Sequence, residues 1–241
     1  MRKSNILTFL PLLALGLFVV VALSGSRMAA LGARPAEKVP QLAQESPSLA
    51  AAASKFQFPQ ELVDRVTNMS ESAQGSYSGY MRLTDDFEAM TVFVPNEWQD
   101  IQTGDWLVQG KKVGNVIEAS SDLNRFKTSH DVPGVFVGAS RVLAAQYSGP
   151  ALLDLRRGEA AAGCEYRGQM HFTDAFYLGD YDYSMNCGAE KQNVIVAAAK
   201  PPNGDHVILI QIVVKSKADL DAAAHVLSTF QVIGDLDAGD H

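Results

Sequence analysis

The chain has 241 residues, which corresponds to one folded domain with additional segments at about 150 residues per domain. Apolar residues make up 47% and charged residues 20%, a composition that is typical of a packed core and not of a disordered chain. The formal net charge of −7 argues against a nucleic-acid-binding protein, because such a protein needs a cationic surface to displace counterions from phosphates. Two cysteines are too few for a four-cysteine zinc site or a disulfide-dense miniprotein.

The N-terminus combines a short basic head with a long apolar run. Arg2 and Lys3 precede residues 6–23, which are 18 residues without a charge. As a helix this run would be roughly 27 Å long, close to the ~30 Å hydrocarbon core of a bilayer. The basic head predicts that the N-terminus stays in the cytoplasm and that the rest of the chain is exported. Residues 1–23 are therefore predicted to be a signal peptide or an uncleaved signal anchor.

Residues 24–75 are predicted to form a linker that holds the folded part away from the membrane. The first part of this stretch is rich in Ala, Ser, Pro and Gln and has no lasting period. A short helix is predicted over residues 59–73, where a proline stands at the first position and apolar side chains recur on one side. The folded domain is predicted to span residues 76–233, and an acidic tail follows over residues 234–241.

Strands dominate the predicted domain. They are expected at residues 80–83, 90–94, 105–109, 115–119, 135–137, 194–199 and 207–214. The first four are expected to form two hairpins, the second of them around the turn at residues 110–112. The last two are nearly continuous apolar runs, which is typical of strands that are covered on both faces.

Four helices are predicted in the same domain, at residues 122–126, 141–147, 151–157 and 218–230. The last of these follows Ser216, with Asp219 three residues later, which is a pair similar to a capping box. Hairpins and a sheet that is covered on both faces predict an α+β fold, namely an α/β/α sandwich with a mostly antiparallel central sheet. An N-terminal hydrophobic helix is expected to precede it.

The two cysteines enclose a hairpin-like stretch. In an exported chain, Cys164 and Cys187 are predicted to form a structural disulfide. A turn at residues 173–174 leaves them 10 and 13 residues from Asp174, and a bulge at Gly179 is expected to absorb the difference. Because no C-x-x-C spacing occurs, no redox role is expected.

The motifs of common enzymes are absent from the sequence. Neither G-x-S-x-G nor G-D-S-G-G occurs, and the nearest serine, Ser140, is predicted to cap a helix. No glycine-rich phosphate loop occurs either. The histidines lack metal-ligand spacing, so each is expected to be solvated; they are His130, His171, His206, His225 and His241. The chain is therefore predicted not to be an enzyme.

One cluster of carboxylates supports a metal hypothesis. Asp180 and Asp182 are expected on the same side of a strand, with Asp174 nearby in the turn. Calcium prefers several hard oxygen ligands, so these three residues form a candidate calcium site. The alternative is an exposed strand of an acidic protein that needs no cofactor.

Several stretches together resemble a known family. They are VPNEW at 94–98, VIEASSDL at 116–123, VPGVFVGAS at 132–140 and VLSTFQV at 226–232, together with the two spaced cysteines. Over about residues 78–233 the chain resembles the extracytoplasmic domain that follows trypsin-like serine protease domains in some bacteria, which is a PsbP-like α/β/α sandwich. The protease portion and its catalytic triad are absent here, so the resemblance implies no proteolysis. It implies a non-catalytic binding or assembly module.

The sequence therefore predicts an accessory protein that binds a protein partner outside the cytoplasmic membrane of a bacterium. It would be a single-pass protein with its N-terminus inside, or secreted if the signal is cleaved, and it would bind no nucleic acid. Aromatic residues of the hairpin are the candidate contacts, because exposed aromatic side chains are favoured at interfaces; these residues are Phe176, Tyr177, Tyr181 and Tyr183. The alternative is a small-ligand-binding protein or a hydrolase with a site built from scattered residues.

Overall fold

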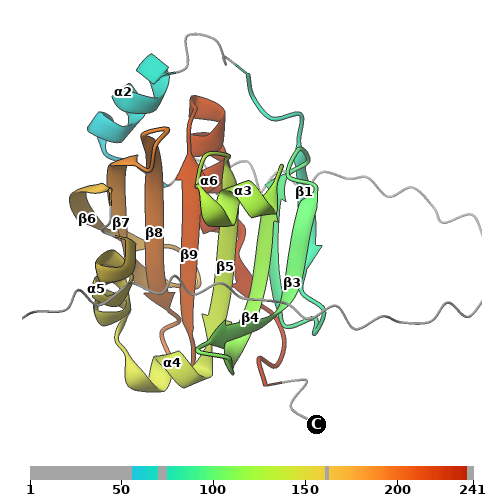
Figure 1. Cartoon of the computed structure of the whole chain (residues 1–241). Helices are drawn as coiled ribbons and strands as arrows, with labels where there is room; N and C mark the ends of the chain where they lie inside the picture. The colour runs from blue at the N-terminus through green and yellow to red at the C-terminus, as the bar shows by residue number, and fades with distance from the viewer. Residues whose placement is uncertain (1–55, 70–74, 161–162, 238–241) are drawn as a thin grey trace, which may run out of the picture.

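The computed structural model describes residues 56–69, 75–160 and 163–237 (Figure 1). Its strands are β1 (Tyr80–Thr84), β2 (Met90–Pro95), β3 (Asp100–Val108), β4 (Lys111–Ser120), β5 (Gly134–Ser140), β6 (Glu165–Thr173), β7 (Leu178–Cys187), β8 (Gln192–Lys200), β9 (Val207–Val214) and β10 (Gln231–Val232). Its helices are α2 (Gln60–Met69), α3 (Leu123–Thr128), α4 (Arg141–Gln146), α5 (Gly149–Ala160) and α6 (Lys217–Thr229).

The strands form two sheets, in the orders β3-β4-β5-β9-β8-β7-β6 and β1-β2-β10. Every strand pair in the described residues is antiparallel, which confirms the predicted strand direction. The predicted N-terminal hydrophobic helix lies outside the described residues. Within the described ranges, no helix has both the length and the apolar character needed to cross a bilayer.

The large sheet is covered on both faces, as its two central strands predict. Ile195 and Ala197 of β8 belong to a core with α2, α6 and β2, whereas Val194 and Val196 belong to a second core with α3, α4 and α5. Successive side chains of a strand point to opposite faces, so a continuous apolar run has to be covered twice. Figure 1 shows the helices of the second core on the near side of the sheet and α6 on the other. The architecture is an α/β/α sandwich.

The folded unit begins before residue 76, earlier than the sequence predicts. Leu62 and Val66 of α2 have no exposed surface, and Phe56 and Phe58 pack against the same core. The sequence predicts this helix to lie in a linker, because a short apolar stripe does not show what will cover it. Contacts with α6 decide that it belongs to the domain.

The hairpin between β3 and β4 also differs from its prediction. Both strands are longer than expected, and a two-residue turn at Gln109 and Gly110 joins them, so that Lys111 and Lys112 lie in β4. Both turn residues have positive φ angles, 52° and 75°. This conformation is that of a type I′ turn, whose twist matches the twist of the paired strands.

Long cationic side chains attach the helices of the second core to polar residues of the sheet. Arg156 Nη2 donates a hydrogen bond to Gln211 Oε1 at 2.9 Å, and Arg157 Nη2 lies 2.7 Å from Asp182 Oδ2. These two acceptors lie on either side of Val196 in the sheet register, so α5 reaches across β8 in both directions. Burial raises the pKa of Asp182, and the Arg157 guanidinium opposes that shift. Gln211 and one carboxylate oxygen of Asp182 therefore have structural partners on α5.

A buried carboxylate joins α6 to the segment before β1. Asp219 is 3% exposed, and its Oδ2 accepts hydrogen bonds from the Lys215 and Ser216 backbone N–H groups and from the Ser216 hydroxyl. The Tyr77 hydroxyl donates to Oδ1, and Trp98 Nε1 donates to that hydroxyl at 3.1 Å. Burial and the adjacent Asp219 carboxylate raise the pKa of Tyr77. The predicted capping box is thus confirmed, with a tertiary contact added to it.

Replacing Asp219→Ala is expected to lower the free energy of unfolding by about 3 kcal/mol, because four donors lose their acceptor and the capping box of α6 keeps only its Ser216 half. The matched control is Asp221→Ala in the same helix, where an exposed carboxylate pairs with Lys217. This control should change stability by less than about 0.5 kcal/mol. Urea-induced unfolding of both variants measures the difference, and equal losses would contradict the role of Asp219.

Candidate functional site

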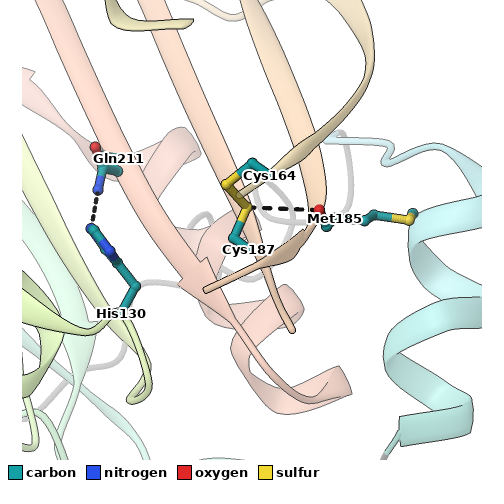
Figure 2. The surroundings of a disulfide bond; sticks show 5 residues. All are labelled: His130, Cys164, Met185, Cys187 and Gln211. Atoms are coloured by element: carbon teal, nitrogen blue, oxygen red, sulfur yellow. Dashed lines mark hydrogen bonds between the residues drawn. A yellow bond between two sulfur atoms is a disulfide. The ribbon is translucent and has the colours of Figure 1, made fainter. Parts of the chain in front are cut away.

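A disulfide joins Cys164 and Cys187, as the sequence predicts (Figure 2). The two Cα atoms are 4.1 Å apart, and Cys187 is 3% exposed, with its Sγ 3.9 Å from the carbonyl oxygen of Met185. Cys164 precedes β6 and Cys187 ends β7. The bond therefore closes the open end of the β6–β7 hairpin.

The bulge that adjusts this hairpin is not at Gly179. The β6–β7 register shifts between Tyr166 and Gly168, which leaves Arg167 as the extra residue. Gly179 has regular partners in both neighbouring strands, and a Cβ atom there would lie 2.4 Å from the Ala198 carbonyl oxygen. Gly179 thus permits close approach of β8, a requirement that the sequence does not display.

The disulfide joins cysteines that are 23 residues apart in the sequence. On the chain-entropy model, closing such a loop raises the free energy of unfolding by roughly 3.5 kcal/mol. We expect the double variant Cys164→Ser/Cys187→Ser to lose about that much unfolding free energy in a urea titration. Thiol titration in denaturant should detect free thiols only after a reductant is added. The same thiol content with and without reductant would show that the bond does not form.

The aromatic residues predicted as partner contacts lie mostly in the core. Tyr177, Tyr181 and Tyr183 are 5%, 1% and 7% exposed, whereas Phe176 is 50% exposed. Burial raises the pKa of Tyr181 to about 12. The three tyrosines pack in the core with α6, so they are not surface contacts in this structure. Aromatic enrichment cannot show from sequence alone which residues a second layer will cover.

The three candidate calcium ligands have separate partners. Asp174 Oδ1 accepts hydrogen bonds from two backbone N–H groups of the hairpin turn, both at 2.7 Å. Asp180 Oδ1 lies 3.2 Å from His171 Nδ1, and Asp182 pairs with Arg157. Among the residues described, no group of three or more His, Cys, Asp or Glu side chains is placed to hold a metal ion. The calcium hypothesis stays a prediction, without a preformed site to support it.

The predicted cap at Ser140 is confirmed, but the histidines are not all solvated. Ser140 Oγ accepts a hydrogen bond from the Leu143 N–H at 2.8 Å. His206 is 7% exposed, and its Nδ1 lies 2.5 Å from Asp205 Oδ1. His225 stacks on the Tyr80 ring at a centroid distance of 3.9 Å. His130 Nε2 lies 3.4 Å from Gln211 Nε2, as Figure 2 shows.

Burial lowers the pKa of His130, His206 and His225, so protonation of these side chains favours the unfolded chain. Their contribution to stability is fully present above the unfolded-state pKa of about 6.5 and is lost as the pH falls below it. We expect the urea concentration at the midpoint of unfolding to decrease as the pH is lowered from 7 to 5.5, because both values lie within about one unit of that pKa. The variant His206→Gln should decrease less, and a midpoint independent of pH would contradict this assignment.

An apolar groove lies beside the β6–β7 hairpin, and its volume is about 690 Å³. Its lining comes from the start of the described chain, from the hairpin and from the C-terminal end of α6. The apolar lining residues are Phe56, Met170, Phe172, Ala175, Phe176, Tyr181 and Leu227. They come from three segments that are far apart in the sequence, so no local pattern predicts the groove. Only Phe176 and Tyr181 belong to the predicted contact set.

The floor of the groove is made of packed aromatic rings, whereas its rim is exposed. The Phe56 ring lies 5.5 Å from the Phe172 ring and 5.2 Å from the Tyr181 ring, measured between centroids. Met170 and Phe176 on the rim are 41% and 50% exposed. The Asp174 carboxylate holds the turn by accepting the Phe176 N–H. This arrangement suits the binding of an apolar group, because the exposed rim side chains gain burial when they are covered.

Comparison with known proteins leaves the family open. No family model matches the chain, and no curated protein matches it. The solution structure of cyanobacterial PsbP (CyanoP) from Synechocystis sp. PCC 6803 is similar over 68% of this chain and 98% of that chain, with 11% sequence identity and a TM-score of 0.41. A similarity of this size transfers no site residue. The resemblance to the domain that follows serine proteases stays a prediction.

Proposed function

We propose that this chain is an exported, non-catalytic accessory protein that binds a segment of a partner protein through the groove beside the β6–β7 hairpin. The observation that carries the proposal is the half-exposed apolar rim around an apolar groove. Exposed large apolar side chains that gather at one place are typical of interaction sites. Export rests on the basic head and the apolar run of residues 1–23.

The polar groups of the groove support binding over catalysis. The Asp174 carboxylate accepts hydrogen bonds from two backbone N–H groups of the hairpin turn. The Ser228 hydroxyl donates a hydrogen bond to the His225 carbonyl oxygen at 3.0 Å. The Tyr181 hydroxyl donates to the Gln57 carbonyl oxygen at 3.1 Å. A nucleophile needs a base beside it, and these three groups instead bond to the backbone. His171 also lines the groove, and its Nδ1 lies 3.2 Å from Asp180 Oδ1.

Both ends of the β6–β7 hairpin are fixed by local bonds, which hold the proposed contact residue Phe176 in place. The disulfide closes one end, and the Asp174 turn closes the other, where Phe176 is exposed. A binding surface that is rigid before association loses less conformational entropy on binding. This surface therefore favours a partner segment that carries apolar side chains.

A small apolar ligand is the second candidate. The groove volume of about 690 Å³ falls within the range of small-molecule sites. Its lining, mainly aromatic and aliphatic with a few polar groups, also fits that class.

The variants Met170→Ser and Phe176→Ser are expected to weaken partner capture at least tenfold, equivalent to about 1.4 kcal/mol. The tagged full chain is cross-linked in its own membranes, and captured proteins are identified by mass spectrometry. Leu178→Ser is the matched control, because Leu178 is also 50% exposed but does not line the groove. We expect it to change capture less than about twofold, since it lies outside the proposed contact.

Thermal unfolding of each variant checks that the bait is folded. A reproducible partner that both rim variants retain would overturn the groove as the contact site. Capture of no partner by folded wild-type bait would favour the small-ligand candidate.

A further inference from the structure

The described chain enters the domain through the wall of the groove. Phe56 is its first residue, and both Phe56 and Gln57 line the groove. The Phe56 ring contacts the floor, and the Gln57 carbonyl oxygen accepts a hydrogen bond from the Tyr181 hydroxyl at 3.1 Å. Whatever path the preceding residues follow, it starts at the groove.

The residues just before Phe56 have the chemistry that the groove favours. Residues 41–55, QLAQESPSLAAAASK, lie outside the described residues. They carry Leu42, Leu49 and four successive alanines, and their charged residues are Glu45 and Lys55. This composition offers apolar side chains with few charges to desolvate.

Covalent linkage gives this segment an advantage over any separate occupant. Leu49 is seven residues from Phe56, so an extended chain would reach up to roughly 23 Å. That reach includes the rim residues Met170 and Phe176, which line the same groove as Phe56. A short linker gives an effective concentration on the order of millimolar, which a free partner rarely attains.

We propose that residues 41–55 bind in the groove of their own chain and compete there with the partner. This inference rests on the proposed function, because it describes regulation of the same site. A partner has to displace the segment before it covers Phe176.

A photo-cross-linker at the rim tests the proposal without any partner. The full chain in detergent carries Phe176→p-benzoylphenylalanine, and trypsin cleavage after Lys38 and Lys55 releases residues 39–55 as one peptide. We expect the main cross-link to join this peptide to the Phe176 peptide within one chain. The same photo-cross-linker at Leu178, outside the groove lining, should yield that product at least fivefold less often.

A second pair of variants separates sequence-specific binding from mere proximity. Leu42→Ser combined with Leu49→Ser should lower the cross-link yield at least fivefold, whereas Gln44→Ala combined with Ser46→Ala should not. Cross-links between two chains, an equal yield at Leu178 or no effect of the leucine variants would overturn the proposal. The cross-linking experiment needs no partner, so its result is independent of the partner-capture experiment. Failure of the intramolecular proposal and failure of the proposed function can therefore be told apart.

Discussion

Burial of β8 and β9 on both faces is the constraint on which the rest of the structure depends. Their side chains alternate between two cores, so neither strand is stable until helices cover both sides of the sheet. One cover is α6 with α2 and the small sheet, and the other is α3, α4 and α5. The groove lies at the margin of the first cover, between Leu227 of α6 and the exposed edge strand β6.

The second cover is attached through charge as well as apolar contact. Arg156 and Arg157 of α5 reach Gln211 and Asp182 on either side of β8, and Lys127 of α3 pairs with Glu118. Burial raises the pKa of Glu118, and Lys127 opposes that shift. Removing one partner of such a pair leaves a buried charge uncompensated, so these contacts specify where each helix lies. This role explains why Asp182, one of the three carboxylates predicted to bind calcium, pairs with Arg157 in the fold.

The hairpin of β6 and β7 connects stability with the proposed function. Its disulfide and its Asp174 turn limit motion at the two ends, and the exposed apolar residues lie near the turn. The Tyr181 and Ser228 hydroxyls and the Asp174 carboxylate beside this hairpin bond to backbone groups. Phe56 and Gln57, the first two residues described, line the same groove.

The sequence by itself determined the features that depend on near neighbours. The β1–β2 hairpin, the Ser140 cap, the Ser216–Asp219 capping box and the disulfide were predictable, because each depends on residues that are close in sequence or on cysteine pairing. Only the tertiary structure decided that α2 belongs to the core, that three tyrosines are covered and that Phe56, Phe176 and Leu227 form one groove. These outcomes depend on which distant surfaces meet, and hydrophobic burial is non-directional, so a local pattern cannot specify its partner.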